Sequence, residues 1–428
     1  DVAVTGVQTC ALPICRLKRY EEALGSYDRA LAISPADVEV LNNRGNALRD
    51  LGRSEEALVS YDRALSLRPD HVQILSNKGN ALKELGRFDE SLATYGRALV
   101  LHPGCVEALY NRANTLRELQ RYEEALADYE RALAVKPDYA EALHNRGATL
   151  QDLNRPEEAL ASHERAVALR PENANFHTSR AHVLSVLRRE PEAIAAYRQA
   201  LALGGDPTLL HYYLAALGAE PAPPTPPRSY VETLFDQYAE RFDDALRQLK
   251  YEIPKLLFDT VIAVNPGAGR DIADLGCGTG MCGVYFKPIA KSLVGVDLAQ
   301  AMIEKSRARG VYDRLVRADL REFLRAHPHA FDLVVTADVF IYVGALEEVF
   351  AATREALRSG GQLAFSVESE GGDGFVLRSS RRYAHSLPYL RRLAAVNGFV
   401  ERAVVPVTVR LAEGKGIPGY NLVFELIT

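Results

Sequence analysis

Small residues and prolines recur every 34 residues through the first half of the chain. Proline occupies positions 35, 69, 103, 137 and 171, and alanine occupies 30, 64, 98, 132, 166 and 200. A period of this length is typical of repeats built from two antiparallel helices, in which small residues allow close approach and proline ends each second helix. We therefore predict stacked helix pairs over residues 16–218, about five complete pairs after a truncated first one.

The second half of the chain has a different pattern, in which short apolar runs alternate with helical segments. Such runs are typical of buried parallel strands, and their alternation with helices predicts a doubly wound sheet with ligands at the carboxyl ends of its strands. The predicted strands are 272–275, 292–296, 314–316, 331–335 and 361–368, with antiparallel edge strands at 403–409 and 422–426. The predicted helices are 299–309 and 345–358, and Ser359–Gly361 predicts a turn.

The two halves are separated by Glu220–Arg228, which contains five prolines in nine residues. Such a stretch predicts a stiff, extended linker. We expect domains at 16–218 and 229–428, held apart by a linker at 219–228.

The first fifteen residues, DVAVTGVQTCALPIC, fit neither the repeat nor a signal peptide. The string VTGVQTCALPI resembles the translation of a sequencing-library adapter. We expect residues 1–15 to be adapter-derived and the natural N-terminus to differ; a lost signal sequence is the alternative.

Composition adds few constraints. A net charge of −5 gives no global attraction to nucleic acid or to an anionic membrane, and no apolar run approaches the length of a membrane span. Cysteines at 10, 15, 105, 277 and 282 show neither metal-ligand spacing nor a disulfide framework. We therefore expect a cytoplasmic protein with reduced thiols, no metal, and neither nucleic acid nor membrane as a partner.

The repeat also places an aromatic residue or histidine at 27, 61, 95, 129, 163 and 197, and glycine or alanine at 45, 79, 113, 147 and 181. The whole pattern resembles the tetratricopeptide repeat (TPR) family, whose members stack into a superhelix with a concave face. The resemblance implies a protein or peptide partner on that face. A scaffold or dimerisation surface is the alternative.

Three rows of first-helix residues are expected to line the concave face. Asparagine and basic side chains suit a peptide backbone or carboxylate. The rows are Asn46, Asn80 and Asn114; Arg49, Lys83, Arg117 and Gln151; and Asn42, Ser76, Tyr110 and His144. A fourth row, Asn43, Asn77, Asn111 and Asn145, is expected to be structural.

The most informative stretch is Asp271–Asp297, which reads as strand, glycine turn, helix and strand. Glycines at 276, 278 and 280 let the backbone turn tightly and approach a ligand. Asp297 ends the next strand about twenty residues further on, where a carboxylate can accept hydrogen bonds from ribose hydroxyls. The spacing differs from the GxGxxG pattern of pyrophosphate dinucleotide sites. A purely structural turn is the alternative.

The string D-x-G-C-G-T-G from Asp274 to Gly280 resembles the first motif of class I S-adenosylmethionine-dependent methyltransferases. The resemblance implies S-adenosylmethionine as cofactor, with Asp297 at the ribose, Asp319 at the adenine amino group and Met302 against the adenine. The cofactor-binding residues implied are Asp274, Gly276, Cys277, Gly278, Gly280, Asp297, Leu298, Met302, Asp319, Leu320, Ala337 and Tyr238. Residues 16–428 also resemble bacterial predicted methyltransferases that contain TPR repeats.

Ser229–Lys250 predicts an amphipathic helical entry that resembles the lid found over the cofactor in many methyltransferases. Tyr230, Phe235, Tyr238 and Phe242 are the candidate lid residues. Packing between helices is the alternative for each of them.

Acceptor-binding residues are expected after the strand at 331–335. Thr336–Tyr342 lacks the [DN]PP[FY] string of amino-methylating nucleic-acid enzymes and the Pro-Cys nucleophile of cytosine-C5 enzymes, and it resembles enzymes acting on small molecules or carboxylates. The substrate-side candidates are Asp338, Tyr342, Tyr383 and His385. Tyr342 and His385 are the catalytic candidates, His385 as a base because imidazole titrates near neutrality. The basic cluster Arg378, Arg381, Arg382, Arg391 and Arg392 suits either an anionic substrate group or a solvated helix face.

The sequence therefore predicts a multidomain protein, with an all-α TPR solenoid followed by a Rossmann-like α/β methyltransferase domain. We expect methyl transfer to an unidentified acceptor, with a small molecule or carboxylate favoured and a protein as the other possibility, and with the repeats mediating protein interaction. One alternative is a TPR scaffold whose second domain binds S-adenosylmethionine without catalysis, and another is different chemistry on a sulfonium or nucleotide cofactor.

Overall fold

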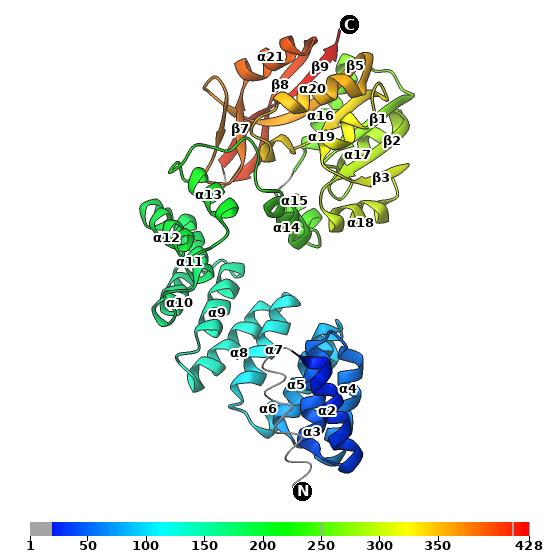
Figure 1. Ribbon diagram of the computed structural model, residues 1–428. Helices are drawn as coiled ribbons and strands as arrows, with labels where there is room; N and C mark the ends of the chain where they lie inside the picture. Colours follow the sequence, from blue (N-terminus) through cyan, green and yellow to red (C-terminus); the bar gives the residue numbers. More distant parts are fainter. Residues whose placement is uncertain (1–18, 250, 413–414, 428) are drawn as a thin grey trace. The chain divides into compact units, whose positions relative to one another are not determined.

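The computed structural model describes residues 19–249, 251–412 and 415–427, and the chain divides into two compact units (Figure 1). They comprise Asp1–Gly205 and Asp206–Thr428. The expectation for residues 1–15 lies outside the described residues, as do the first three residues of the predicted repeat region.

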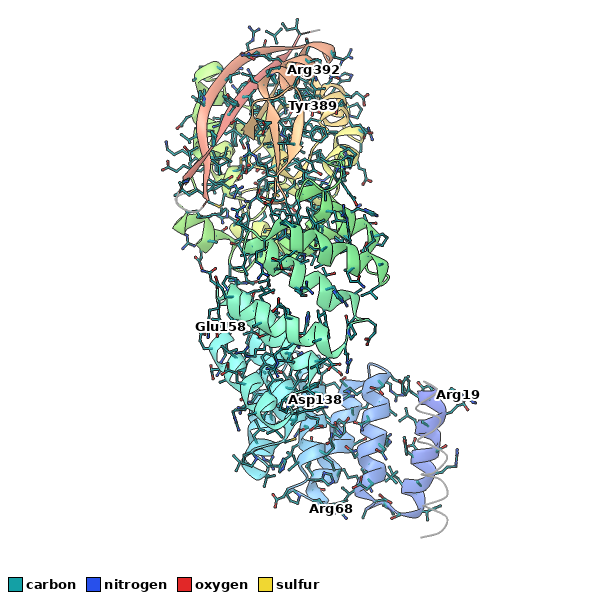
Figure 2. All side chains as sticks on the ribbon, turned by 90° about the vertical axis from the view of Figure 1, so that its left-hand side faces the viewer. Arg19, Arg68, Asp138, Glu158, Tyr389 and Arg392 are labelled. Atoms are coloured by element: carbon teal, nitrogen blue, oxygen red, sulfur yellow. The ribbon has the colours of Figure 1, made fainter. Side chains whose placement is uncertain are left out.

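The first unit is an array of antiparallel helices, which confirms the helix pairs predicted from the 34-residue period. Among the residues described from 19 onward, one helix precedes five pairs. The helices are α2 (Tyr20–Ile33), α3 (Val38–Asp50), α4 (Ser54–Leu67), α5 (Val72–Glu84), α6 (Phe88–Leu101), α7 (Val106–Glu118), α8 (Tyr122–Val135), α9 (Ala140–Asp152), α10 (Pro156–Leu169), α11 (Ala174–Val186) and α12 (Glu190–Ala202). Charged side chains such as Arg68, Asp138 and Glu158 are exposed on this array (Figure 2).

The recurring glycines at 45, 79 and 147 each contact the aromatic residue or histidine of their own helix pair. An added Cβ on Gly79 of α5 would lie 2.5 Å from Cε1 of Tyr95 in α6, so only a residue without a side chain fits there. The Tyr95 hydroxyl donates to Oδ1 of Asn80 at 2.5 Å. Gly45 and Tyr61 make the same contact in the preceding pair. The two positions share the 34-residue period because a small residue, glycine here and alanine at 113 and 181, leaves room for the aromatic ring.

The next helix, α13 (Pro207–Ala216), belongs to the second unit. Asp206 caps its start by accepting hydrogen bonds from the backbone N–H groups of Thr208 and Leu209. The Tyr212 hydroxyl donates to the carbonyl of Arg381 at 2.8 Å. The division between units therefore falls after Gly205, earlier than the boundary expected at 218.

The second unit is built on a mostly parallel sheet with the strand order β3-β2-β1-β4-β5-β7-β6. The strand β9 pairs antiparallel with β5, and β8 pairs with β9. The strands are β1 (Arg270–Leu275), β2 (Ala290–Asp297), β3 (Arg314–Arg317), β4 (Phe331–Thr336), β5 (Leu357–Glu370), β6 (Phe375–Leu377), β7 (Tyr383–Ser386), β8 (Phe399–Ala412) and β9 (Lys415–Leu426). This arrangement confirms the predicted α/β fold with an antiparallel edge.

Helices cover both faces of the sheet, as the apolar runs of its strands require. In β1, Ile272 packs with α16 and α17, whereas Ala273 packs with the cluster that includes α19 and α20. In β5, Ala364 packs on the same face as Ile272 and Phe365 packs on the same face as Ala273. The helices are α14 (Arg228–Tyr238), α15 (Phe242–Gln248), α16 (Ile253–Val264), α17 (Met281–Phe286), α18 (Gln300–Arg309), α19 (Leu320–Arg325), α20 (Glu347–Ala356) and α21 (Leu387–Val396).

Three local features differ from expectation. The predicted helical entry is two helices, α14 and α15, separated at Ala239–Arg241. Ser359–Gly361 lies inside β5, where the register against β4 shifts between Phe331 and Leu333. The short strands β6 and β7 were not predicted, because neither carries a long apolar run.

Candidate active site

A cavity of about 730 Å³ lies at the carboxyl ends of the parallel strands in the second unit. The loops after β1 and β4, the end of β2 and the segment after β3 contribute to it, which is where doubly wound sheets bind ligands. The expected cofactor residues that line it are Gly276, Cys277, Gly278, Asp297, Leu298, Asp319, Leu320 and Ala337. The expected catalytic residue Tyr342 lines it as well.

The glycine loop after β1 adopts backbone conformations that residues with a side chain rarely adopt. Gly276 and Gly278 have φ values of 65° and 53°, in the left-handed region that favours glycine. An added Cβ on Gly276 would overlap Cγ2 of Val339 and lie 3.0 Å from its Cγ1. At Gly278 the nearest atom would be Cε1 of Phe242, at 3.8 Å. Bare backbone therefore reaches the cavity, and Val339 limits how closely the loops after β1 and β4 approach each other.

Asp297, the last residue of β2, both holds this loop and lines the cavity. It is 9% exposed. Its Oδ2 accepts a hydrogen bond from the Gly278 N–H at 2.8 Å, and its Oδ1 accepts one from the Ala299 N–H at 2.9 Å. Burial raises its pKa, although these backbone N–H groups oppose the shift. Because each carboxylate oxygen has two lone pairs, Asp297 can still accept hydrogen bonds from two adjacent hydroxyl groups.

Asp319 caps the start of α19 and lines the same side of the cavity. Its Oδ1 accepts from the backbone N–H of Arg321 at 2.8 Å, and its Oδ2 lies 3.1 Å from the Arg321 guanidinium. Burial acts to raise the pKa of Asp319, but the hydrogen bonds from Arg321 bring it below its ordinary value. The carboxylate is therefore ionised and available to a hydrogen-bond donor in the cavity.

Asp274 and Gly280 do not line the cavity, contrary to expectation. Asp274 is buried and accepts a hydrogen bond from the Tyr312 hydroxyl at 2.5 Å. Burial raises its pKa to about 7. Gly280, with φ 89°, precedes the first residue of α17 and packs against Ser306 and Tyr312. Both residues lie outside the cavity wall: Asp274 is held by Tyr312 in the core, and Gly280 lies at the start of α17 beside Ser306 and Tyr312.

Of the four candidate lid residues on the entry helices α14 and α15, two line the cavity and two do not. Phe235 and Phe242 line the cavity, whereas Tyr238 is 39% exposed and packs edge-on against Phe242. Tyr230 packs on the tyrosines of α13 instead. Met302, expected at the adenine, is buried with Phe235 and Phe242 where α18 meets α14. Tyr238 and Met302 therefore do not line the cavity, because Tyr238 packs on Phe242 and Met302 packs between α18 and α14.

His385, expected to act as a base, does not line the cavity. Its imidazole is buried, and Nε2 lies 2.9 Å from the carbonyl oxygens of both Val343 and Gly344. Burial lowers its pKa to about 4. Tyr383 is also buried and donates to the carbonyl of Pro223 at 3.0 Å. This placement contradicts a role for His385 as a base and gives both side chains a structural role.

Asp338, Tyr342, Arg382 and Arg410 line the cavity on the side of β4 and β5. Nε of Arg382 donates to the Tyr342 hydroxyl at 3.3 Å. The Asp338 backbone has φ 62°, and burial raises the pKa of its carboxyl group to about 7. Sequence reasoning singled out Asp338 and Tyr342 but missed Arg410. No local signal marks Arg410, because it reaches the cavity from β8.

The other arginines of the expected basic cluster make contacts elsewhere. Arg392 lies on α21 near Tyr389, with its guanidinium 5.7 Å from the ring centroid (Figure 2). The remaining contacts are Arg378 with Glu368, Arg391 with Glu401, Arg392 with Asp373, and Arg381 over the ring of Tyr213. Of this cluster, only Arg382 lines the cavity.

The proline-rich segment forms part of the cavity wall and packs on the second unit. The Pro224 carbonyl accepts hydrogen bonds from the N–H groups of Gly344 at 3.0 Å and Ala345 at 2.8 Å. Thr225 and Pro226 line the cavity. The segment expected as a stiff linker at 219–228 thus makes hydrogen bonds to the loop after β4 and contributes to the cavity wall.

In the first unit, contacts between repeats occupy most of the rows expected to bind a peptide. Neighbouring repeats neutralise the basic row through Arg49–Glu84, Lys83–Glu118 and Arg117–Asp152, at 3.6, 3.1 and 3.3 Å. Asn46, Asn80 and Asn114 accept hydrogen bonds from the recurring tyrosines. Asn42 and Ser76 are buried, so they do not face a partner.

The fourth asparagine row makes inter-repeat hydrogen bonds, from Asn77 to Asn42 and from Asn145 to Tyr110. A hollow of about 410 Å³ remains between the first helices. Its lining mixes amides with both signs of charge. The lining residues are Arg49, Asn80, Lys83, Glu84, Asn111, Asn114 and Glu118.

Two searches of the described residues gave negative results. None of their helices is long and apolar enough to cross a membrane. Over 19–249, 251–412 and 415–427, no three His, Cys, Asp or Glu side chains are grouped so that they could hold a metal. Cys105, Cys277 and Cys282 are free thiols; Cys10 and Cys15 lie outside the described residues.

Comparison with protein families matches residues 273–365 to a methyltransferase domain. Tetratricopeptide repeat families match 105–172, 144–207 and 72–103, and a TPR repeat family matches 15–49 and 45–86.

Similar proteins are found among methyltransferases. A ubiquinone biosynthesis O-methyltransferase of Thiobacillus denitrificans is 26% identical over 33% of this chain and 64% of its own length. The human methyltransferase-like protein 27 is 31% identical over 27% of this chain and 46% of its length. A probable S-adenosylmethionine-dependent methyltransferase, CRG1, of Saccharomyces cerevisiae is 28% identical over 26% and 40%. The chain spans less than two thirds of each of these relatives.

Among solved structures, the type IV pilus biogenesis factor PilW is 22% identical over 47% of this chain and 94% of its own, with a TM-score of 0.44. A crystal structure of MamA is 20% identical over 37% and 93%, with a TM-score of 0.35.

Proposed function

Since the chain carries tetratricopeptide repeats between residues 15 and 207 and a methyltransferase domain at 273–365, we propose that it transfers a methyl group from S-adenosylmethionine to a small-molecule acceptor. The observation that carries this proposal is the cavity at the strand ends. There the bare backbone of Gly276 and Gly278 meets the buried carboxylate of Asp297.

The residues present fit this cofactor. The glycines with positive φ leave space that a Cβ would fill, and a side chain at these positions would strain the backbone. Asp297 can accept hydrogen bonds from two ribose hydroxyls, and Asp319, on the same side, can accept one from the adenine amino group. Leu298 and Leu320 contribute apolar surface next to these two carboxylates. This set of groups suits a nucleoside joined to a polar amino-acid part.

When bound, S-adenosylmethionine supplies a methyl group already activated on a sulfonium centre. The protein therefore contributes mainly by positioning the acceptor and excluding water. Phe235 and Phe242 cover the cavity from α14 and α15. The backbone N–H of Ala301 donates to Asp236 at 3.0 Å, which ties α14 to the start of α18. Tyr342 and Asp338 lie at the β4 end, where they can contact an acceptor.

For the repeats, we propose a protein or peptide partner that contacts the hollow around Asn80 and Lys83. Its amides and mixed charges suit an extended backbone with both acidic and basic side chains. A photo-crosslinking residue at Asn80 should capture a partner from the source cell, whereas one at the exposed position Glu158 should not. Equal capture at both positions would contradict a specific surface.

The cofactor site is tested by calorimetric titration of S-adenosylmethionine into the full chain and its Asp297→Asn variant. The substitution keeps the side-chain volume but removes charge-assisted hydrogen bonds worth about 1.5–3 kcal/mol. Affinity should fall by about 10- to 150-fold. Asp373→Asn, which alters only the ion pair with Arg392 outside the cavity, should bind normally. Unchanged affinity in a folded Asp297→Asn protein would refute the site.

A further inference from the structure

The part of the cavity near β4 and β5, which we call the acceptor end, contains one guanidinium group that pairs with no carboxylate of the described residues. It is formed by Asp338, Tyr342, Arg382 and Arg410. A charged pocket wall that is not neutralised from within the protein favours a ligand of the opposite charge.

Arg410 and Arg378 share the buried carboxylate of Glu368. Glu368 is fully buried, and its two oxygens accept from Arg410 at 2.9 Å and Arg378 at 2.9 Å. One carboxylate therefore serves two guanidinium groups. Arg378 also lies 3.6 Å from Glu370, whereas Arg410 has no second carboxylate within ion-pairing distance among the described residues.

Arg382 is the least compensated of these groups. Its contacts are the Tyr342 hydroxyl, at 3.3 Å, and the Tyr342 ring, whose centroid lies 5.9 Å away. In the described part of the chain no carboxylate lies within ion-pairing distance of it. Arginine has five N–H donors in a planar fork that matches a carboxylate. A partly buried guanidinium with most of these donors unused is suited to bind an anionic group of a ligand.

Asp338 provides the second recognition element. Its backbone N–H donates to Oγ of Ser366 at 2.7 Å, which fixes the loop in its left-handed conformation. Its Oδ1 is buried and has no hydrogen-bond partner. Burial, together with Glu368, raises the pKa of Asp338 to about 7, and Arg382 and Arg410 oppose this shift, so both protonation states of the carboxyl group are accessible near neutral pH. An unpaired carboxylate oxygen beside a cavity is suited to a ligand hydroxyl.

Apolar residues complete the acceptor end. Phe235, Leu249, Ile341 and Val409 line the cavity along with the polar groups. An occupant must therefore combine one anionic group, one hydroxyl and a compact apolar body.

We propose that the methyl acceptor is a small hydroxy carboxylate, with its carboxylate bound by Arg382 and its hydroxyl by Asp338. This inference rests on the proposed methyltransferase function and names the acceptor class. In the transfer step, the acceptor O–H bond breaks and its proton passes to the ionised Asp338. A carbon–oxygen bond forms to the methyl group as the carbon–sulfur bond of the donor breaks, with its electron pair kept by sulfur.

The test is calorimetric titration of the full chain, saturated with S-adenosylhomocysteine, with hydroxy carboxylates and their neutral amides. The probes are 4-hydroxybenzoate, salicylate, mandelate and lactate, each paired with its amide. At least one carboxylate should bind about tenfold more tightly than its amide, since a charge-assisted bidentate pair is lost in the amide. Arg382→Gln should abolish this preference, and Arg382→Lys should keep part of it.

Arg391→Gln is the matched control, because Arg391 pairs with Glu401 away from the cavity. It should leave the preference unchanged. If S-adenosylhomocysteine binds but no carboxylate is preferred over its amide, the acceptor class is wrong while the proposed function stands. If S-adenosylhomocysteine fails to bind, the proposed function itself fails.

Product analysis with labelled S-adenosylmethionine decides which oxygen is methylated. An ether at the hydroxyl, lost in Asp338→Asn while carboxylate binding persists, supports the assignment of Asp338. A methyl ester at the carboxylate would overturn the orientation and the proton transfer to Asp338.

Discussion

Substituting Gly276 with alanine tests whether the contact between the loops after β1 and β4 controls the cavity. An alanine at φ 65° carries a backbone cost of about 1–2 kcal/mol. Its Cβ would also overlap Val339, and overpacking of this kind costs about 1–3 kcal/mol. The free energy of unfolding of the second unit should therefore fall by about 2–5 kcal/mol.

Gly278→Ala is the matched control, since its φ of 53° imposes the same kind of backbone cost. Its added Cβ would meet only Cε1 of Phe242, at 3.8 Å, so the expected loss is about 1–2 kcal/mol. The difference between the two variants isolates the packing cost. Val339→Ala combined with Gly276→Ala should recover that difference in a double-mutant cycle.

Hydrogen exchange of peptides from β1 and β4 under increasing urea gives the free energy of the second unit alone. This matters because a chain of two units does not unfold in one step. Equal destabilisation by the two alanines, or no coupling between positions 276 and 339, would refute the packing argument.

Two further predictions follow from single contacts. Burial raises the pKa of Asp274 to about 7, so the stability that its protonated form contributes is greatest below its unfolded pKa of about 4 and is lost as pH rises to about 7. Asp274→Asn should remove this pH-dependent loss of stability. If the melting temperatures of both proteins change with pH in the same way between pH 4 and pH 8, the prediction is contradicted. In the repeats, Gly79→Ala should destabilise the first unit by about 1–3 kcal/mol, because its Cβ would collide with Tyr95. Gly96→Ala, in a helix with open space around it, should stabilise the unit by about 0.5–1 kcal/mol. Hydrogen exchange of α5 and α6 peptides measures both effects, and equal effects would be inconsistent with the contact between Gly79 and Tyr95.

The repeat architecture could be predicted because its determinants are local and periodic. Gly79 and Tyr95 belong to the same helix pair, so their dependence on each other appears as a spacing in the sequence. The strands of the sheet were predictable for a similar reason, since buried parallel strands such as β4 need apolar residues on both faces. The glycine loop and Asp297 were found because a tight turn and a strand end constrain residue type.

The sequence was less informative wherever function depends on which distant segments meet. Arg410 reaches the cavity from β8, and Pro226 reaches it from the segment expected to be a spacer. His385 has the chemistry of a base, but two backbone carbonyls hold it in the core. Met302 and Asp274 occupy positions that fit the family pattern, and the fold uses both as support. Residue type and spacing identify candidate site residues. Their burial and hydrogen-bond partners in the fold decide whether they line the cavity or support the residues that do.

Calorimetric titration of the unaltered full chain with S-adenosylmethionine, S-adenosylhomocysteine and NAD tests the central claim most directly. A site made of bare glycine backbone, Asp297 and Asp319 should bind the first two ligands with similar affinity and leave NAD unbound. Binding of NAD in place of the other two would contradict the cofactor assignment. No binding of any of the three would contradict the methyltransferase function and favour a repeat scaffold with an inactive second unit.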